Sequence, residues 1–155
     1  MATEKWGSGA GQGLQWGNAF SSATLNSIAN GNAIQSDVSI ANGVALDIFC
    51  DISLTLASAA FVAPAYVGFY LYPLNRDGST YGDGRFTTSA AGPPPGLYFV
   101  GNVGFVAATQ AQSGVLTRIT MPPGTFKFVL YNQGGVALAA SGNTCYYRTY
   151  DRSIA

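Results

Sequence analysis

The clearest pattern of hydrophobic and polar positions lies between Val44 and Leu56, with the sequence VALDIFCDISLTL. Side chains of a β-strand point alternately to its two faces, so an apolar residue at every second position indicates a strand with one buried face. The other face, which carries Asp47, Phe49 and Asp51, is expected to be partly solvated. The residues of the buried face are Leu46, Ile48, Cys50, Ile52, Leu54 and Leu56.

Further segments with strand character follow, and short turn sequences separate them. Asn42-Gly43 and Pro122-Pro123-Gly124 are typical of turns between strands. We predict eight or nine strands. In addition to 44–56 they are expected at 32–40, 66–74, 96–108, 115–121, 125–132, 136–140 and 144–151.

These strands predict an all-β fold, an antiparallel two-sheet sandwich or barrel. No segment of helical length separates them, so the crossovers that a parallel sheet needs cannot form. The long connection at 75–95 favours a jelly roll, in which the chain follows a Greek-key path. An immunoglobulin-like sandwich is the second choice, because neither tryptophan lies between Cys50 and Cys145, where that fold has one.

One short helix is expected at the N-terminal side of the domain, over Ser21–Gly31. Ser21 or Ser22 can cap its start, and Asn30-Gly31 is a typical helix end. Residues 1–19 are rich in glycine, which predicts a flexible N-terminal arm. We therefore expect a single β-sandwich domain over residues 20–155, which should stay folded when residues 1–19 are deleted.

The composition restricts the classes of partner. Charged residues make up only 9% of the chain, against about 25% in ordinary soluble proteins, and the net charge is +0. Binding of nucleic acid needs clustered Lys and Arg, so we expect none. No apolar run approaches the about 20 residues of a membrane span, and the N-terminus lacks the features of a secretory signal. A surface of Ser, Thr, Asn, Gln, Gly and aromatic residues favours an assembled protein.

The sequence contains no catalytic constellation. It has no histidine, which removes the usual general base and the commonest metal ligand. Asp47 and Asp51 would lie about 13 Å apart on one strand, too far for a glycosidase pair, and we interpret them as charges that prevent unwanted strand pairing. The loop 75–84 resembles a calcium loop but lacks the closing Glu. We predict no enzyme, metal or cofactor, and we expect Cys50 and Cys145 to be buried free thiols.

Aromatic residues are the candidate partner-binding residues. Trp6, Trp16 and Phe20 lie in or next to the arm, where they either pack onto the domain or dock on a neighbouring subunit. Tyrosines on one face of 66–74 suit an interface or line the outer sheet under a loop. Aspartates flank Phe49, and tyrosines alternate with arginine in the last strand. The full set is Trp6, Trp16, Phe20, Phe49, Tyr70, Tyr72, Tyr146, Arg148 and Tyr150.

The run from Phe20 to Leu56, FSSATLNSIANGNAIQSDVSIANGVALDIFCDISLTL, resembles the N-terminal part of small virion proteins of tailed bacteriophages. The segment YLYPLNRDGSTYGDGRF and the aromatic last strand also fit that pattern, so the resemblance covers about residues 20–155. Such proteins are similar to capsid decoration, or cement, proteins with a jelly-roll fold. These sit as dimers on the outer surface of the phage head, bridge major capsid subunits and reinforce the shell.

The resemblance implies a structural virion protein, made in the cytoplasm of the bacterial host, whose partners are the major capsid protein and a second copy of itself. It transfers no catalytic residue. The alternative is a carbohydrate- or receptor-binding module of a tail fibre or spike, in which tyrosines and the loop 75–85 would form the site.

Overall fold

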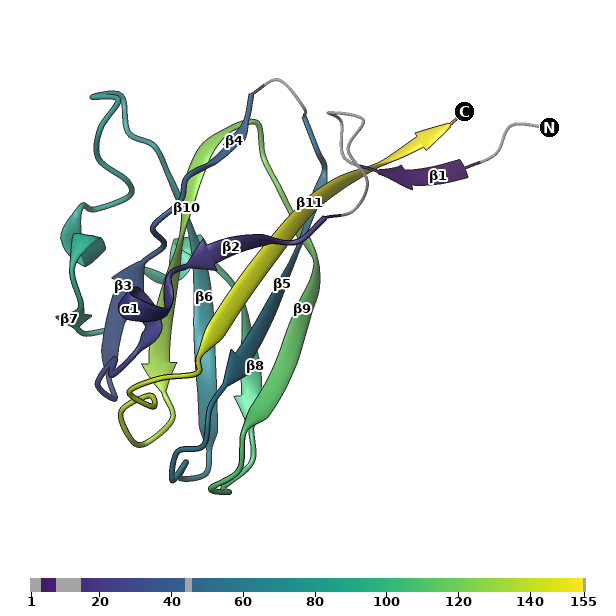
Figure 1. Cartoon of the computed structure of the whole chain (residues 1–155). Helices are drawn as coiled ribbons and strands as arrows, with labels where there is room; N and C mark the ends of the chain where they lie inside the picture. The colour runs from purple at the N-terminus through teal and green to yellow at the C-terminus, as the bar shows by residue number, and fades with distance from the viewer. Residues whose placement is uncertain (1–3, 8–14, 44–45, 155) are drawn as a thin grey trace.

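The computed structural model describes residues 4–7, 15–43 and 46–154, with the backbone alone for 4–7 and 152–154. The strands form two antiparallel sheets (Figure 1). The first has the order β1-β11-β5-β9, with β2 beside β1 on the same edge of β11. Its strands are β1 (Glu4–Gly7), β2 (Gly17–Phe20), β5 (Phe49–Leu56), β9 (Gln112–Thr120) and β11 (Thr144–Ile154).

The second sheet has the order β7-β3-β10-β6-β8, and β4 also pairs with β10. Its strands are β3 (Asn32–Gln35), β4 (Ile40–Asn42), β6 (Ala65–Pro73), β7 (Ala90–Ala91), β8 (Phe99–Phe105) and β10 (Gly124–Gln133). The helical segments are α1 (Ser22–Leu25) and the 3₁₀ turns η1 (Arg85–Thr87) and η2 (Gly96–Tyr98).

The order of the strands confirms the predicted jelly roll. In the first sheet the principal strands run β2-β11-β5-β9, and in the second they run β3/β4-β10-β6-β8. The chain passes from one sheet to the other at most connections, and the first and last strands of the sandwich, β2 and β11, pair with each other. This path makes the two Greek keys of an eight-stranded jelly roll.

The hydrophobic core lies between the two sheets. Cys50, Ile52, Leu54 and Leu56 are completely buried, as the alternation predicted. Phe126, Phe128 and Leu130 of β10 lie in the same core cluster, from the opposite sheet. Burial of each such side chain contributes about 1.5–3 kcal/mol, so this pair of facing rows is a principal source of stability.

The predicted strand 44–56 begins later than expected. Val44 and Ala45 lie outside the described residues, and β5 starts at Phe49. Leu46 and Ile48 are 53% and 45% exposed, so their assignment to the buried row was wrong. The backbone is irregular at 46–48: Leu46 has a φ of 51°, and the Asn42 side chain donates a hydrogen bond to the carbonyl oxygen of Asp47 (2.8 Å).

The helix is also shorter than predicted. Ser21 caps α1 by accepting a hydrogen bond from the Thr24 N–H, as expected, but the helix ends at Leu25. Beyond it the backbone pairs with the connection between β10 and β11, where Ser27 donates to Ala139 and Ile28 accepts from Leu138. The same contacts also fix residues 136–140. We predicted a strand there, but the segment is irregular.

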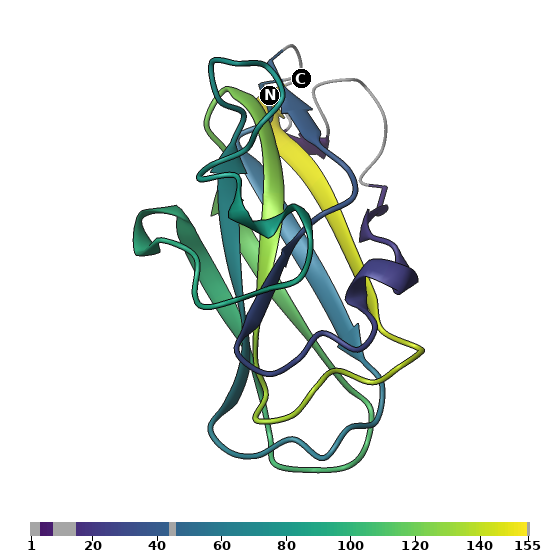
Figure 2. The ribbon, with the colours of Figure 1, turned by 90° about the vertical axis from the view of Figure 1, so that its left-hand side faces the viewer.

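The long connection between β6 and β8 covers the outer face of the second sheet. In Figure 2 it lies over β10 and β6, on the side away from β5 and β11. Phe86 of this connection is fully buried and packs on Tyr72 with ring centroids 6.2 Å apart. The molecule therefore has a second, smaller apolar cluster outside the sandwich, made of Ala33, Tyr70, Tyr72, Phe86 and Val129.

The two cysteines are free and buried, which confirms the prediction. Burial raises the pKa of both thiols above the usual range of cysteine. No helix within the described part of the chain is long and apolar enough to cross a membrane.

Candidate partner-binding face

The outer face of the first sheet collects most of the predicted contact residues. Alternation along β11 turns Tyr146, Arg148 and Tyr150 outward, and alternation along β5 does the same for Phe49 and Asp51. The register places Arg148 directly opposite Asp51 and Tyr150 directly opposite Phe49. Residues about 100 positions apart in the chain thus become cross-strand neighbours.

Asp51 is the centre of this face, and its side chain is only 3% exposed. Arg148 donates two hydrogen bonds to its Oδ2, from Nε at 2.9 Å and from Nη2 at 2.8 Å. The Tyr150 hydroxyl and the Arg118 backbone N–H both donate to Oδ1, each at 2.9 Å. A buried carboxylate is stable only with such partners, and these four hydrogen bonds fix three neighbouring strands relative to one another.

The Arg118 amide is available because β9 is irregular at that point. The pairing of β5 with β9 shifts register between Cys50 and Ile52, opposite Thr117 and Arg118. Arg118 has a φ of 59°, which is uncommon for a residue with a side chain. An extra residue in one strand leaves an N–H outside the ladder, and Asp51 accepts its hydrogen bond.

The electrostatics of the site keep Asp51 ionised. Burial alone would raise the pKa of this carboxyl, but the Arg118 N–H, the Arg148 guanidinium and the Tyr150 hydroxyl hold its pKa below the usual value of 3.8. Burial and the hydrogen bond to Asp51 raise the pKa of Tyr150. At neutral pH the site therefore contains a carboxylate, a guanidinium and a neutral phenol.

Aromatic rings surround this polar centre. The Arg148 Cζ atom lies 4.5 Å from the ring centroid of Trp16, and the Arg118 Cζ atom lies 5.8 Å from that of Phe49. The rings of Phe49 and Tyr150 pack with centroids 5.7 Å apart. We refer to this set as the Arg148 patch; its members are Trp16, Phe49, Arg118, Tyr146, Arg148 and Tyr150. Tyr150 is only 7% exposed, so it supports the patch without offering surface to a partner.

Part of the Arg148 patch is exposed and can contact another molecule. Trp16 is 41% exposed and Tyr146 is 37% exposed. The Arg148 side chain keeps 29% of its surface exposed although Asp51 holds it in place. Trp, Tyr and Arg are the residue types that contribute most to protein interfaces, and a side chain that is already ordered loses little entropy when it binds.

The other predicted contact residues lie elsewhere. Phe20 is 3% exposed and belongs to the core between the sheets. Tyr72 is fully buried and Tyr70 is 8% exposed, so these rings line the outer sheet beneath a loop and offer no surface to a partner. The side chain of Trp6 lies outside the described residues; its backbone, in β1, pairs with β11.

Sequence reasoning missed the roles of Asp51 and Arg118. Asp47 and Asp51 were interpreted as charges on a partly solvated strand face that prevent unwanted pairing, whereas both are buried. The position of Asp51 opposite Arg148, four residues after the start of β11, could have indicated a pair, but only with the register known. Arg118 had no signal at all, because a β-bulge leaves no fixed pattern in a single sequence.

The fold and the site together define a jelly-roll β-sandwich with a preorganised aromatic and arginine surface on one sheet. No protein-family model matches the chain, and no curated protein matches its sequence. Within the described residues no group of three or more His, Cys, Asp or Glu could hold a metal ion.

Proposed function

We propose that this protein is a non-enzymatic structural virion protein that binds and reinforces a phage capsid shell, that is, a capsid decoration protein. The proposal rests on the Arg148 patch, where the buried Asp51 carboxylate fixes Arg148 beside Trp16, and where Trp16, Tyr146 and part of Arg148 stay exposed. The jelly-roll fold supports it, because the sequence resemblance to decoration proteins implied that fold.

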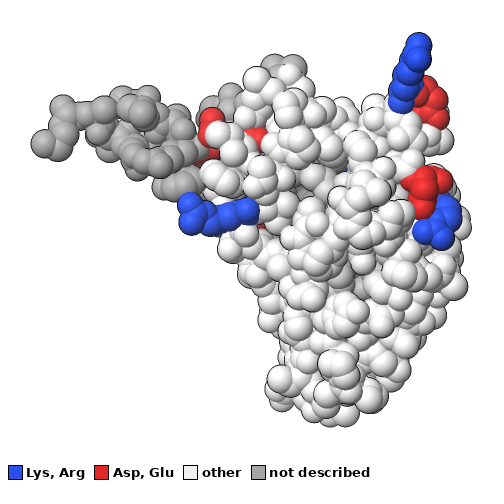
Figure 3. Space-filling view, turned by 180° about the vertical axis from the view of Figure 1, so that it is seen from behind, with Lys and Arg blue, Asp and Glu red and all other residues white. Residues whose placement is uncertain are grey.

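The low charge of the surface also supports an assembled state. Figure 3 shows the face opposite to that of Figure 1, where the few charged side chains gather toward the upper end and the lower part shows none. No residue in 86–117 or 128–147 is charged. Such a surface loses little hydration energy when another protein covers it, since burial of charges is what makes an interface costly.

The major capsid protein is the proposed main partner, and a second copy of the chain is the other. A homodimer would carry two Arg148 patches and could bind two capsid subunits at once. The second contact would then form at high effective concentration, so moderate affinity at each patch would give stable attachment and join adjacent subunits.

Shells of the cognate phage assembled without this protein provide the test. Purified wild-type protein is added, and cryo-electron microscopy measures its position and occupancy. Replacing both exposed rings, Trp16→Ala with Tyr146→Ala, should lower affinity for the shell by at least about tenfold, because a truncated interface hot spot costs 2 kcal/mol or more.

The matched control is Val62→Ala, at an exposed apolar side chain (57%) in the β5–β6 turn, far from the patch in sequence. This variant should bind like the wild type. Failure of the wild-type protein to bind shells, or its location at the tail, would exclude the decoration role. Equal binding by the double variant would exclude the Arg148 patch as the contact.

The alternative is a carbohydrate- or receptor-binding module of a tail fibre or spike. The exposed rings of Trp16 and Tyr146 support this alternative, because aromatic rings can also stack on sugars. A glycan array separates the two functions. Specific binding of a glycan that Trp16→Ala abolishes, together with location at the tail, would replace the decoration proposal.

A further inference from the structure

In the described part of the chain, the edge of the second sheet lacks a paired strand along part of β3. Strand β7 covers β3 only at Asn32 and Ala33, which pair with Ala91 and Ala90. The segment that precedes β7, which includes η1, lies over the outer face of the sheet. An uncovered strand edge presents backbone N–H and C=O groups that can pair with another chain.

The backbone N–H and C=O groups without a partner strand are those of Gln35. Its neighbour Ser36 donates its N–H to the Phe128 carbonyl of β10. Backbone groups of successive residues in a strand point to opposite edges, so those of Gln35 point away from β10. The register of β7 would place Thr88 opposite Gln35, but no backbone hydrogen bond joins these residues.

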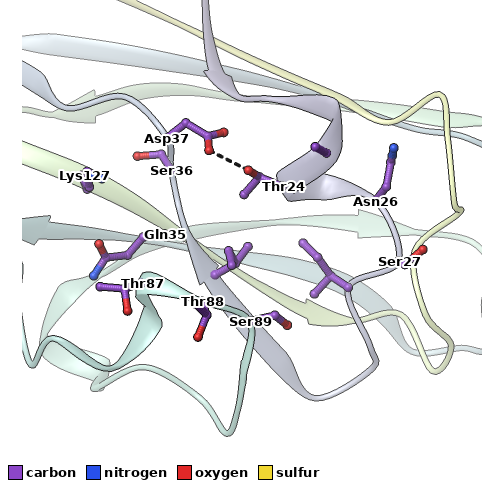
Figure 4. Close-up of a pocket in the computed structure, with 13 residues that line it drawn as sticks. Thr24, Asn26, Ser27, Gln35, Ser36, Asp37, Thr87, Thr88, Ser89 and Lys127 are labelled. Carbon is purple, nitrogen blue, oxygen red and sulfur yellow. Dashed lines mark hydrogen bonds between the residues drawn. The ribbon is translucent and has the colours of Figure 1, made fainter.

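A hollow of about 480 Å³ lies over this edge. In Figure 4, α1 with Thr24 lies on one side of β3, and Thr87, Thr88 and Ser89 lie on the other. The volume is within the range of about 300–1,000 Å³ that is usual for ligand sites. No aromatic residue lines it.

The Gln35 side chain supplies an independent sign of a missing partner. The residue is only 6% exposed, and its Nε2 atom is enclosed without any hydrogen-bond acceptor. An unpaired buried donor costs about 1–3 kcal/mol, which an acceptor that reaches it would recover. The side chains of Thr87 and Thr88 next to it are exposed and can turn outward to admit one.

We propose that this groove binds an extended peptide segment of a partner protein, which adds a strand to the edge of β3. The backbone of its central residue pairs with the N–H and C=O of Gln35, as in other cases of strand addition. The groove lies on the second sheet, whereas the Arg148 patch lies on the first. The peptide-binding proposal therefore goes beyond the proposed function and does not depend on it.

The lining of the groove defines the side chains of that segment. The central residue points to the same side as Gln35, where Nε2 and Lys127 are donors, so it should carry an acceptor such as a carboxylate. Its two neighbours point the other way, toward Ala23, Ile28 and Ile34, and should be small and apolar. The expected pattern is apolar–acceptor–apolar.

The probe is the blocked peptide acetyl-Ser-Val-Asp-Val-Ser-amide, titrated into the full-length ¹⁵N-labelled protein. Amide shifts should change in 23–37 and 87–89 and not around the Arg148 patch. A copy of the peptide N-methylated at the central Asp cannot donate to the Gln35 carbonyl. Loss of a backbone hydrogen bond and the added methyl group should weaken binding by about tenfold.

A pair of substitutions tests the side-chain contact. Gln35→Leu keeps the backbone edge but removes the Nε2 donor, and a central Leu in the peptide removes the acceptor. Each change alone should weaken binding severalfold, and the two together should cost less than the product of the single effects. Trp16→Ala should bind the peptide like the wild type.

Three outcomes would overturn the proposal. One is the absence of shifts in 23–37 with the unmodified peptide. The second is equal binding of the methylated and unmethylated peptides, which would exclude backbone pairing. The third is the same set of shifts with N-acetylglucosamine and none with the peptide, which would assign the groove to a carbohydrate.

Discussion

At the scale of single residues, Asp51 has the widest influence on the outer face of the first sheet. It lies on the middle strand and binds groups from both flanking strands, the Arg148 and Tyr150 side chains of β11 and the Arg118 amide of β9. The orientation of Arg148 beside Trp16 follows from this carboxylate. The exposed part of the patch therefore depends on a residue that is itself buried.

Replacement of Asp51 by Ala should lower the free energy of unfolding by about 2–3 kcal/mol. Breaking a buried ion pair usually costs about 3–5 kcal/mol, but Arg148 is 29% exposed and can turn to water, which reduces the loss. Urea unfolding measures it. Asp83→Ala, which removes an exposed pair with Arg85, is the control and should cost less than about 1 kcal/mol. Equal losses would contradict the central role of Asp51.

The same carboxylate should make stability depend on acidity. Its pKa is lower in the folded chain than the value of 3.8 it has when unfolded, so its contribution is complete above pH 3.8. This stabilising contribution is lost as the pH falls from 3.8 through the pKa of the folded state, because the unfolded chain then binds the proton more readily than the folded chain. Urea unfolding between pH 6 and pH 2 should show a smaller acid loss in Asp51→Asn than in the wild type. Parallel curves would contradict the assignment.

At the scale of elements, the connection from Leu74 to Tyr98 acts as a fixed cover over the second sheet. Leu74 and Tyr81 form a bridge at its start, and Asn75 donates to the Thr80 hydroxyl and the Gly82 carbonyl. Gly82 lies directly against the Tyr72 ring, and a Cβ atom there would be 2.1 Å from Tyr72 Cδ2. The cover can approach so closely only because this residue has no side chain.

Gly82→Ala should therefore destabilise the protein by about 3–4 kcal/mol. The positive φ of 56° contributes about 1–2 kcal/mol, and the clash with a fully buried ring contributes the rest. Gly78→Ala, at a φ of 71° but with no atom within 4 Å, isolates the backbone term and should cost about 1 kcal/mol. Chemical denaturation compares the two variants. Equal effects would mean that the cover does not press on Tyr72.

The alternation of side chains predicted the strands well but not the points at which they stop. Cys50 to Leu56 follow the expected pattern, since the ladder with both neighbours holds them. Leu46 and Ile48 continue the pattern in sequence but lie in an irregular segment, where Asn42 donates to the Asp47 carbonyl and to the distant Pro122 carbonyl. Likewise, α1 ends early because another loop pairs with its C-terminal side. A local pattern contains no information about such contacts.

Only part of the binding face was predictable. Alternation placed Arg148 and Tyr150 on one face of the last strand, and this is where they lie. That Trp16 would stack on Arg148, or that Asp51 would be buried, depends on the pairing of strands distant in the chain. The burial of Tyr70 and Tyr72 was one of two alternatives, and the sequence alone could not select it because the position of the covering connection was not known.

At the scale of the whole molecule, the N-terminal boundary of the domain differs from the predicted one. The expected arm, 1–19, includes most of β2, where Ala19 is fully buried and Phe20 is 3% exposed. In Figure 1, β1 and the end of β11 lie outside the sandwich, whereas β2 runs along it. The predicted deletion of 1–19 would therefore remove part of the fold.

Deletion of residues 1–14 should change the free energy of unfolding by less than about 1 kcal/mol, because an isolated two-stranded ribbon is only marginally stable. Deletion of 1–20 should cost at least about 3 kcal/mol, since it removes β2 and the core side chain of Phe20. Thermal and urea unfolding of both variants measure the difference. Equal stability would contradict the assignment of β2 to the sandwich.

The burial of the two thiols has a practical consequence for locating the protein in an assembly. Cys50 and Cys145 are 0% and 1% exposed and have raised pKa values, so the thiolate that attacks a maleimide is nearly absent. The native chain should stay unlabelled until it unfolds. A single new cysteine at exposed Ser141 should then accept one label per chain without removal of either native cysteine. A gold or fluorescent tag at that site would allow the copies on a particle to be counted and mapped directly.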